Sequence, residues 1–237
     1  MKKHLKRNAA PRTWDIDRKK NTFILRPKSS GHPLEAGLPL GIILRDDLKL
    51  AATTAEVKKI LHHTSVLVDG KRQQEYHFQV GLFDIFALEE KKQFFTVIFD
   101  RKGRVILQEI PSTWASQKVA KVTGKTMLNG GKVQLHFHDG KNMLTDQTVA
   151  LGDSVVRIFP EGKINKVLPL QTGATAFLLK GKHRGDFGVI KEIHGNQATY
   201  LRDNKTIETL KEYLFVLPSD FPLIKKQIKE EKEEVKV

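Results

Sequence analysis

Apolar residues recur at helical spacing in one stretch of the chain, residues 38–63. A first, short helix is predicted near its start, where Leu38, Ile42 and Leu48 provide apolar positions. The segment that follows, TTAEVKKILHH, carries a second helical pattern. Two short helices in succession are therefore expected here.

The second helix has a well-defined predicted start. Thr53 is a candidate N-cap, and Glu56 stands three residues later, which is the spacing of a capping box. Val57, Ile60 and Leu61 then recur at helical spacing and are expected to face a core. The lysines and histidines between and after them are expected to lie nearer to solvent.

Extended chain is predicted after these helices. Residues Ser65–Asp69 are rich in β-forming residues and end at Asp69–Gly70, a dipeptide typical of a tight hairpin turn. Tyr76–Leu88 continues as extended chain. The order helix, helix, strand, turn, strand predicts a compact α/β unit, and its lysines and arginines could make one side strongly positive.

The remainder, residues 89–218, alternates short β-rich runs with turn signals at a spacing of about 8–12 residues, which predicts small all-β modules. In one strand, Lys132–His138, Val133, Leu135 and Phe137 share a face. The fold class expected for the whole chain is therefore α+β, built from several modules.

Two histidines on the other face of that strand, His136 and His138, raise the question of a metal site. No third and fourth ligand is apparent in the sequence. We therefore expect no metal, and interpret this face as a polar surface that meets RNA or solvent.

A glycine-rich loop is predicted within the run GKHRGDFGVI, where Gly181, Gly185 and Gly188 permit a tight turn and close approach of the backbone to a partner. The three cations between the first two glycines suit phosphate oxygens. The GK[ST] ending of a nucleotide-binding P-loop is absent. A generic glycine-rich hairpin is the alternative.

The N-terminal residues 1–32 carry ten Lys and Arg against two Asp, and they show no apolar periodicity. Pro11 and Pro27 interrupt any long helix. Such a segment is expected to pack on no core and to become ordered on a partner. Trp14 in its midst suits stacking on a base or packing against the globular body. A disordered tail without a specific role is the alternative.

Charge and composition narrow the class of protein. The chain has 41 Lys and Arg against 27 Asp and Glu, a formal net charge of +14. This charge favours a polyanionic partner, of which nucleic acid is the first choice and an acidic membrane the second.

Residue types that are absent exclude several functions. Cysteine is absent, so thiol catalysis and disulfides are excluded. No apolar run is long enough to span a bilayer, and no signal peptide is recognisable. Neither a GxSxG elbow nor an HExxH helix occurs. A cytoplasmic, non-enzymatic protein without cofactors or a small-molecule substrate is expected.

Several runs carry a family resemblance. LPL, LRDDLKLA, EVKKIL and VLVDGK resemble the RNA-binding fold shared by bacterial ribosomal protein four and its relatives. KKHLKRNAAPRTW, RPKSSGH and QLHFHDGKN are similar to runs of the archaeal and eukaryotic-type small-subunit ribosomal protein four, the "e" type. The glycine loop and the strand after it resemble the KOW motif. The tail lacks a strongly basic extension, which favours an archaeal member.

The resemblance implies five parts. These are a basic N-terminal extension (1–36), an RNA-binding α/β module (37–90), a central β domain (91–172), a KOW-type small barrel (173–218) and a charged C-terminal tail (219–237). It implies a structural constituent of the small ribosomal subunit, with small-subunit rRNA and neighbouring ribosomal proteins as partners. A transcription or translation factor with a KOW motif, or an accessory of an RNA-modification enzyme, remains the alternative.

The residues expected to contact RNA are the cations of these modules and a few polar or aromatic neighbours. They are Lys2, Lys3, His4, Lys6, Arg7, Arg12, Trp14, Arg18, Lys19, Lys20, Arg26, Lys28, Ser30, His32, Arg45, Lys49, Lys58, Lys59, Lys71, Lys182, His183 and Arg184.

Overall fold

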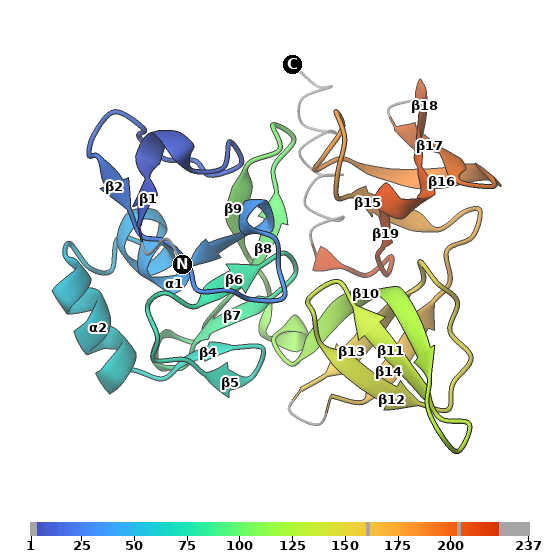
Figure 1. Cartoon of the computed structure of the whole chain (residues 1–237), viewed down its shortest axis with the longest axis horizontal. Coiled ribbons are helices and arrows are strands. Elements are labelled where there is room, and N and C mark those ends of the chain that lie inside the picture. The colour runs from blue at the N-terminus through green and yellow to red at the C-terminus, as the bar shows by residue number, and fades with distance from the viewer. Residues whose placement is uncertain (1–3, 160–161, 203–204, 223–237) are drawn as a thin grey trace. The chain divides into compact units, whose positions relative to one another are not determined.

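The structure is a computed structural model that describes residues 4–159, 162–202 and 205–222. The chain divides into two compact units. The first comprises Met1–Lys118 with Phe159–Glu161, and the second comprises Val119–Ile158 with Gly162–Val237 (Figure 1). Strands predominate in both units. Among the described residues, the helical segments longer than a 3₁₀ turn, 40–47 and 54–63, lie in the first unit, so the fold is α+β and mostly β.

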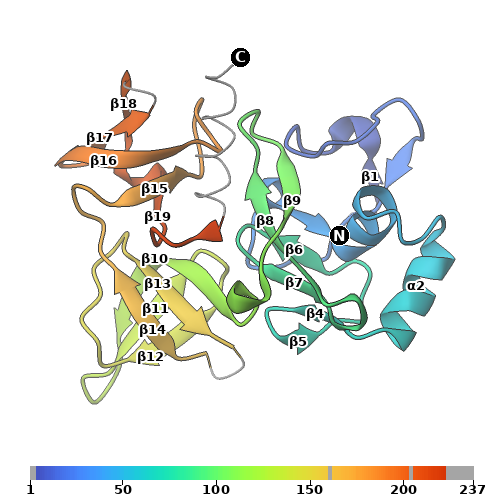
Figure 2. The same cartoon turned by 180° about the vertical axis from the view of Figure 1, so that it is seen from behind.

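A five-stranded antiparallel sheet in the order β5-β4-β7-β8-β9 is the largest element of the first unit (Figure 2). Its strands are β4 (Val66–Val68), β5 (Lys71–Arg72), β7 (Ile85–Leu88), β8 (Gln93–Phe99) and β9 (Val105–Glu109). Strands β8 and β9 lie beyond residue 90, where we placed the end of the α/β module. They nevertheless pair with β7 and with each other, so the sheet continues past that position.

The helices of the first unit lie where predicted, except that Leu38 belongs to a short strand, Gly37–Pro39, and precedes the first helix. α1 (Leu40–Ile42) continues as a π-helical turn (Ile43–Asp47), and α2 (Thr54–His63) begins after the predicted cap. The Thr53 hydroxyl accepts a hydrogen bond from the Glu56 backbone N–H at 3.3 Å, which satisfies one of the orphan donors at the helix start. Val57 and Leu61 are buried and Ile60 is half-buried, so the predicted core face is confirmed.

The predicted Asp69–Gly70 turn is also confirmed. Both residues have positive φ angles, 51° and 73°, as a type I′ hairpin turn requires. The turn joins β4 to β5 and pairs Val68 with Lys71. Glycine meets this backbone requirement without strain, and aspartate is among the side chains that tolerate it.

The described part of the N-terminal arm packs into the first unit. β1 (Leu5–Lys6) pairs with β2 (Phe23–Ile24), and β3 (Gly37–Pro39) pairs with β6 (Gln79–Gly81). Trp14 is only 2% exposed and forms a backbone bridge with Val105. The expectation that this arm packs on no core is therefore wrong for residues 4–32. Its few apolar side chains have no period of their own, but they find partners on strands that come much later in the chain.

The second unit contains two five-stranded antiparallel sheets, in the orders β12-β11-β10-β13-β14 and β18-β17-β16-β15-β19. The strands of the first are β10 (Gln117–Met127), β11 (Val133–Phe137), β12 (Asn142–Thr145), β13 (Ser154–Ile158) and β14 (Ile164–Leu168). The strands of the second are β15 (Thr175–Leu178), β16 (Phe187–His194), β17 (Gln197–Arg202), β18 (Lys205–Leu210) and β19 (Leu214–Val216).

Each sheet of the second unit has its own apolar cluster. The first gathers Leu135 and Phe137 with apolar residues of β10 and β13, which confirms the alternation predicted for residues 132–138. The second centres on Tyr200, which is fully buried. Two clusters, one for each sheet, give this unit two separate apolar cores.

Short 3₁₀ turns complete the architecture, at Arg7–Ala9, Leu34–Ala36, Glu89–Lys91, Ser112–Trp114 and Lys211–Tyr213. Among the described residues, every helix is too short or too polar to cross a membrane. Most of the predicted charged tail, residues 223–237, lies outside the described residues.

Candidate nucleic-acid interface

Most cations expected to meet RNA lie exposed on the surface. In the N-terminal segment these are His4, Lys6, Arg12, Lys19, Lys20 and Lys28. Lys28 is 2.5 Å from the Glu75 carboxylate, but the Lys28 side chain is 65% exposed and so remains accessible to a phosphate. Lys2 and Lys3 lie outside the described residues. This segment therefore presents positive charge on a packed scaffold and not on a free tail.

Two arginines of the same segment are instead used to hold its backbone. Arg18 donates hydrogen bonds to the carbonyl oxygens of Ala10 and Pro11, at 2.8 and 2.7 Å. Arg7 is buried and donates to the Asp17 carbonyl oxygen at 2.9 Å. A guanidinium carries five donors in a fixed fork and can satisfy several carbonyls at once. These side chains are committed to the fold, and a phosphate contact by Arg7 would require it to leave its buried position.

Trp14 and His32 are also buried, contrary to the expectation that both contact RNA. The Trp14 indole N–H donates to the Leu34 carbonyl oxygen at 3.3 Å, so the ring packs on the globular body, which is the second of the two roles considered for it. The His32 ring lies against Gly81 and is 3.2 Å from the Asp84 carboxylate. Neither ring is accessible to a base in this conformation.

The remaining polar candidates of the arm lie partly buried. Arg26 reaches the His4 carbonyl oxygen at 3.5 Å, and Ser30 donates to the Gln79 side chain at 2.9 Å. The first contact lies within the arm, and the second joins the arm to β6. Arg26 and Ser30 remain half-exposed, so an RNA contact by either stays a prediction.

The helical module supplies a second set of exposed cations, namely Lys49, Lys58, Lys59 and Lys71. Lys58 Nζ lies 4.7 Å from the centroid of the Tyr76 ring, a cation–π contact that fixes its direction. Arg45 is half-exposed and pairs with Asp46 through two hydrogen bonds of 2.8 Å, which raise the pKa of the Arg45 guanidinium. This module thus keeps four lysines available to a polyanion.

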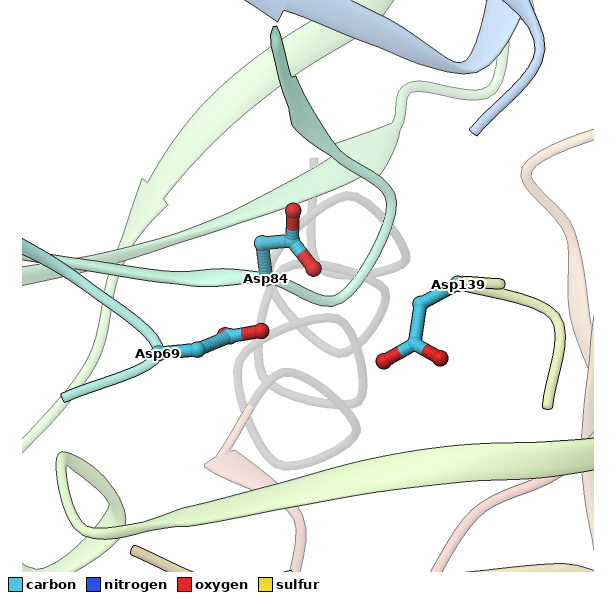
Figure 3. Close-up of side chains that lie close together, drawn as sticks. All are labelled: Asp69, Asp84 and Asp139. Atoms are coloured by element: carbon cyan, nitrogen blue, oxygen red, sulfur yellow. The ribbon is translucent and has the colours of Figure 1, made fainter. Parts of the chain in front are cut away.

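A buried cluster of charges that could not be predicted from the sequence holds the first unit together. The Lys118 side chain is fully buried, and its ammonium donates to Asp69 at 2.7 Å and to Asp84. Asp84 also accepts from the Gly81 backbone N–H at 2.7 Å and contacts His32. Figure 3 shows the Asp69 and Asp84 side chains. Because every polar group in this cluster has partners, it is a structural network.

Burial and charge act in opposite directions on Asp84. Burial alone would raise the pKa of its carboxyl, but the neighbouring Lys118 and His32 outweigh that effect and hold the pKa well below its usual range. Asp139, the third side chain drawn in Figure 3, belongs to the second unit, where Arg157 donates to its carboxylate at 2.6 Å.

The glycine loop of the second unit has the predicted backbone geometry. Gly181 and Gly185 have φ angles of 88° and 91°, which favour glycine. A side chain at Gly188 would overlap the Tyr200 ring, so the third glycine is needed for close packing. The three glycines therefore have two different roles, since two shape the loop and the third lets β16 approach β17.

The three predicted cations of this loop differ in exposure. Lys182 is exposed, whereas His183 and Arg184 are half-buried. His183 Nδ1 lies 3.4 Å from Asp186, which is also paired with Arg202. Lys182 is therefore the cation of the loop that is most available to RNA.

The two histidines considered for a metal both have protein partners. His136 uses both ring nitrogens, one 2.7 Å from the Thr126 hydroxyl and one 2.9 Å from Asn142 Oδ1. His138 accepts from the Lys121 backbone N–H at 3.2 Å and packs edge-on against Phe215. Their side chains thus stabilise β10 and β11 and the neighbouring sheet.

Sequence reasoning missed several exposed cations of the second unit because it weighed only those flanked by glycine. They are Lys125, Lys132, Lys141, Lys163, Lys166, Lys180, Lys191 and Lys205. Most lie on or next to β-strands, where alternation of exposed and buried positions could have identified them. The positive surface therefore includes both units.

Comparisons with known proteins agree on one family. The family model described as Ribosomal family S4e matches residues 91–164, and that of the RS4NT domain matches residues 1–35. Small ribosomal subunit protein eS4 of Methanocella arvoryzae is 39% identical over 227 residues, which cover 93% of this chain and 96% of that protein. The eS4 protein of Methanocaldococcus jannaschii is 38% identical over 240 residues, which cover 94% of this chain and 97% of that protein.

A solved structure extends the agreement to the fold. The crystal structure of the 30S ribosomal protein S4e from Thermoplasma acidophilum superposes with a TM-score of 0.68 at 29% sequence identity. The superposition covers 78% of this chain and 96% of that one.

Proposed function

Because this chain belongs to ribosomal family S4e, we propose that it docks on small-subunit rRNA through exposed lysines and arginines of both of its units. As a member of that family it is a structural constituent of the small ribosomal subunit. The observation that supports rRNA binding is the distribution of its +14 net charge over cations that remain exposed after the units have folded. The cytoplasmic ribosome is the location that follows from this role.

The proposed mechanism is multivalent. Each exposed lysine that neutralises a phosphate releases counterions, which contributes affinity without reading the base sequence. Contacts from the arm, the helical module and the glycine loop belong to one chain, so the first contact raises the effective concentration for the others. The packed scaffold fixes the relative positions of the cations within each unit, so less ordering entropy is lost on binding than a free tail would lose.

The glycine loop and its sheet have a specific part in this proposal. We assign residues 173–218 to a KOW-type small barrel whose loop places Lys182 at a phosphate. The positive φ angles at Gly181 and Gly185 and the contact of Gly188 with Tyr200 support this assignment. Neighbouring small-subunit proteins are the remaining proposed partners. Neither a small-molecule substrate nor a catalytic role is part of the proposal.

Sedimentation tests the function directly. A tagged full-length chain is expected to sediment with small subunits and whole ribosomes, and to remain there after a high-salt wash. Loss of most of the chain in the wash would favour the alternative of a transiently bound factor. A chain that stays at the top of the gradient under all salt conditions would contradict a structural role in the subunit.

The loop contact has its own test. Lys182→Ala is expected to lower rRNA affinity and to reduce the slope of log affinity against log salt concentration by about 0.7–0.9. Lys191→Ala removes one exposed lysine of the same module without touching the loop, and serves as the matched control. A salt slope for Lys182→Ala equal to that of the native chain would place Lys182 away from phosphate.

A further inference from the structure

A cavity of about 440 Å³ lies in the second unit, beside the glycine loop. Its wall includes Leu178 at the end of β15, Lys180 and Lys182 of the loop, Leu210 at the end of β18, and Tyr213. Sites that enclose small organic ligands occupy about 300–1,000 Å³. The cavity is therefore large enough for a nucleobase with its sugar.

The aromatic side chain in this wall, Tyr213, lies next to a glycine of the loop, Gly181. Tyr213 is half-buried and closes the 3₁₀ turn Lys211–Tyr213. A Cβ atom at Gly181 would lie 3.5 Å from Cδ2 and Cε2 of the ring, so any larger side chain there would extend over that edge of the ring. Gly181 thus keeps that edge of the ring clear of a side chain, and the half-buried ring, which lines the cavity, retains surface for contact with a base.

The charge of the wall suits a nucleotide. Lys180 and Lys182 are exposed, and neither forms an ion pair with a residue in the part of the chain that the structure describes. Glu208 lies in the same wall and can accept a hydrogen bond from an exocyclic amine of a base. Its negative charge repels a phosphate, which leaves the two lysines as the phosphate-binding side.

We propose that this cavity binds one unpaired nucleotide of RNA, with the base against Tyr213 and its phosphate beside Lys180 and Lys182. The inference deepens the proposed function, because it rests on the chain binding rRNA. A base inside an A-form helix is stacked and paired and cannot enter such a cavity, whereas a base in a loop, a bulge or a single strand can. Stacking on an aromatic ring accommodates every base, because each has a π-face.

An adjoining cavity of about 630 Å³ shares Lys180 and Leu210 with this one, but its chemistry is less suitable. Its buried Lys121 donates to the carbonyl oxygens of Glu212 and Leu214, each at 2.6 Å, and burial lowers the pKa of its ammonium to about 8. The Lys121 ammonium already donates its hydrogen bonds to backbone carbonyls and is therefore less available to a phosphate. The first cavity, with its two exposed lysines and its accessible ring, is the better nucleotide site.

The test compares single-stranded and double-stranded RNA on the full chain. The probe is a short single-stranded RNA of mixed sequence that carries 2-aminopurine, and the reference is its blunt duplex. Tyr213→Leu is expected to weaken single-strand binding by about 5- to 150-fold, the range observed when one stacking aromatic is removed, and to abolish quenching of the 2-aminopurine. Binding of the duplex should change by less than about twofold, because phosphate contacts elsewhere remain.

Two further variants keep the result interpretable. Tyr213→Phe keeps the ring and is expected to bind the single strand like the native chain, which separates stacking from a contribution of the hydroxyl, whereas unchanged duplex binding by Tyr213→Leu reports an intact fold. Lys180→Ala is expected to weaken binding of the single strand more than Lys191→Ala does. Lys191→Ala is the control because it removes the same charge from β16, outside the cavity.

The outcomes separate this inference from the function it rests on. The cavity holds no nucleotide if Tyr213→Leu binds the single strand as tightly as the native chain does. The same conclusion follows if the substitution weakens duplex binding as much as single-strand binding. In either case rRNA binding and sedimentation with subunits remain intact. If the native chain fails to bind rRNA and does not sediment with subunits, the proposed function itself is wrong, and the inference falls with it.

Discussion

Removing the buried ammonium of Lys118 should be among the most damaging single changes to the first unit. Lys118 is fully buried and lies between Asp69 and Asp84, so Lys118→Met leaves two carboxylates buried without their shared cation. Breaking a buried ion pair by removing one partner costs about 3–5 kcal/mol. At about 2–4 °C per kcal/mol for a protein of this size, the melting temperature should fall by about 6–20 °C.

Tryptophan fluorescence reports this effect selectively. The chain has two tryptophans, Trp14 and Trp114, and both are buried in the first unit. Urea unfolding monitored by their emission therefore follows the unit that contains Lys118. Lys59→Met, an exposed lysine on α2, is the matched control and should change the unfolding free energy by less than about 0.5 kcal/mol.

The effect should depend on pH in a defined direction. In the native chain the pKa of Asp84 is lowered, so its stabilising contribution is complete above its unfolded pKa of about 3.9 and is lost as the pH falls below that value. Without Lys118, burial favours the protonated form of the Asp84 carboxyl. The unfolding free energy of the variant therefore falls less than that of the native chain as the pH is lowered. The deficit of Lys118→Met should therefore be largest near neutral pH and shrink towards about pH 4. A deficit below about 1 kcal/mol at neutral pH would refute the reasoning, since it would mean that the network contributes little.

Three further predictions concern the N-terminal arm. Trp14→Ala should lower the unfolding free energy by about 3–5 kcal/mol, measured by urea unfolding followed by circular dichroism, because the indole lies in a core. Gly81→Ala should release the arm to limited proteolysis, because its methyl group would overlap the His32 ring. Replacing both Lys19 and Lys20 by Ala should reduce the salt slope of rRNA binding by about 1.4–1.8, with the unfolding free energy within about 0.5 kcal/mol of native.

Each of these has a contrary outcome. If Trp14→Ala has the same unfolding free energy as the native chain, the arm does not pack on the core of the first unit. Protease resistance of Gly81→Ala equal to that of the native chain would mean that the His32 ring moves aside without cost. An unchanged salt slope after loss of both arm lysines would place that face of the arm in solvent.

Features that depend on a few neighbouring residues could be predicted from the sequence. The cap at Thr53 and the turn at Asp69–Gly70 are decided by side chains within three or four positions, and the structure has both. The buried face of residues 132–138 follows from the alternation of a strand in the same way. The family resemblance rests on such local runs, and the comparisons confirm it.

The burial of the arm could not be predicted because its partners are remote. Trp14 pairs with Val105, and His32 contacts Asp84, which lies 52 residues away. In the sequence, Arg18 is one more cation in a basic run, but in the structure its hydrogen bonds go to backbone carbonyl oxygens. Charge density indicates a polyanion-binding protein. It does not show which cations form hydrogen bonds within the fold and are therefore less available to a partner.

The backbone bridge between Trp14 and Val105 also sets an order of events during synthesis. The arm is synthesised first, but Val105, with which the Trp14 backbone forms its bridge, is encoded 91 residues later. At about 5–20 residues per second, the nascent arm waits about 5–20 s before that partner exists. During that interval the Trp14 backbone lacks its bridge to β9, while the positive charge of the arm is already complete. Synthesis of β9 supplies this partner, whereas Lys118, whose ammonium pairs with Asp69 and Asp84, is added later, so the arm can dock before the charge network of the first unit is complete.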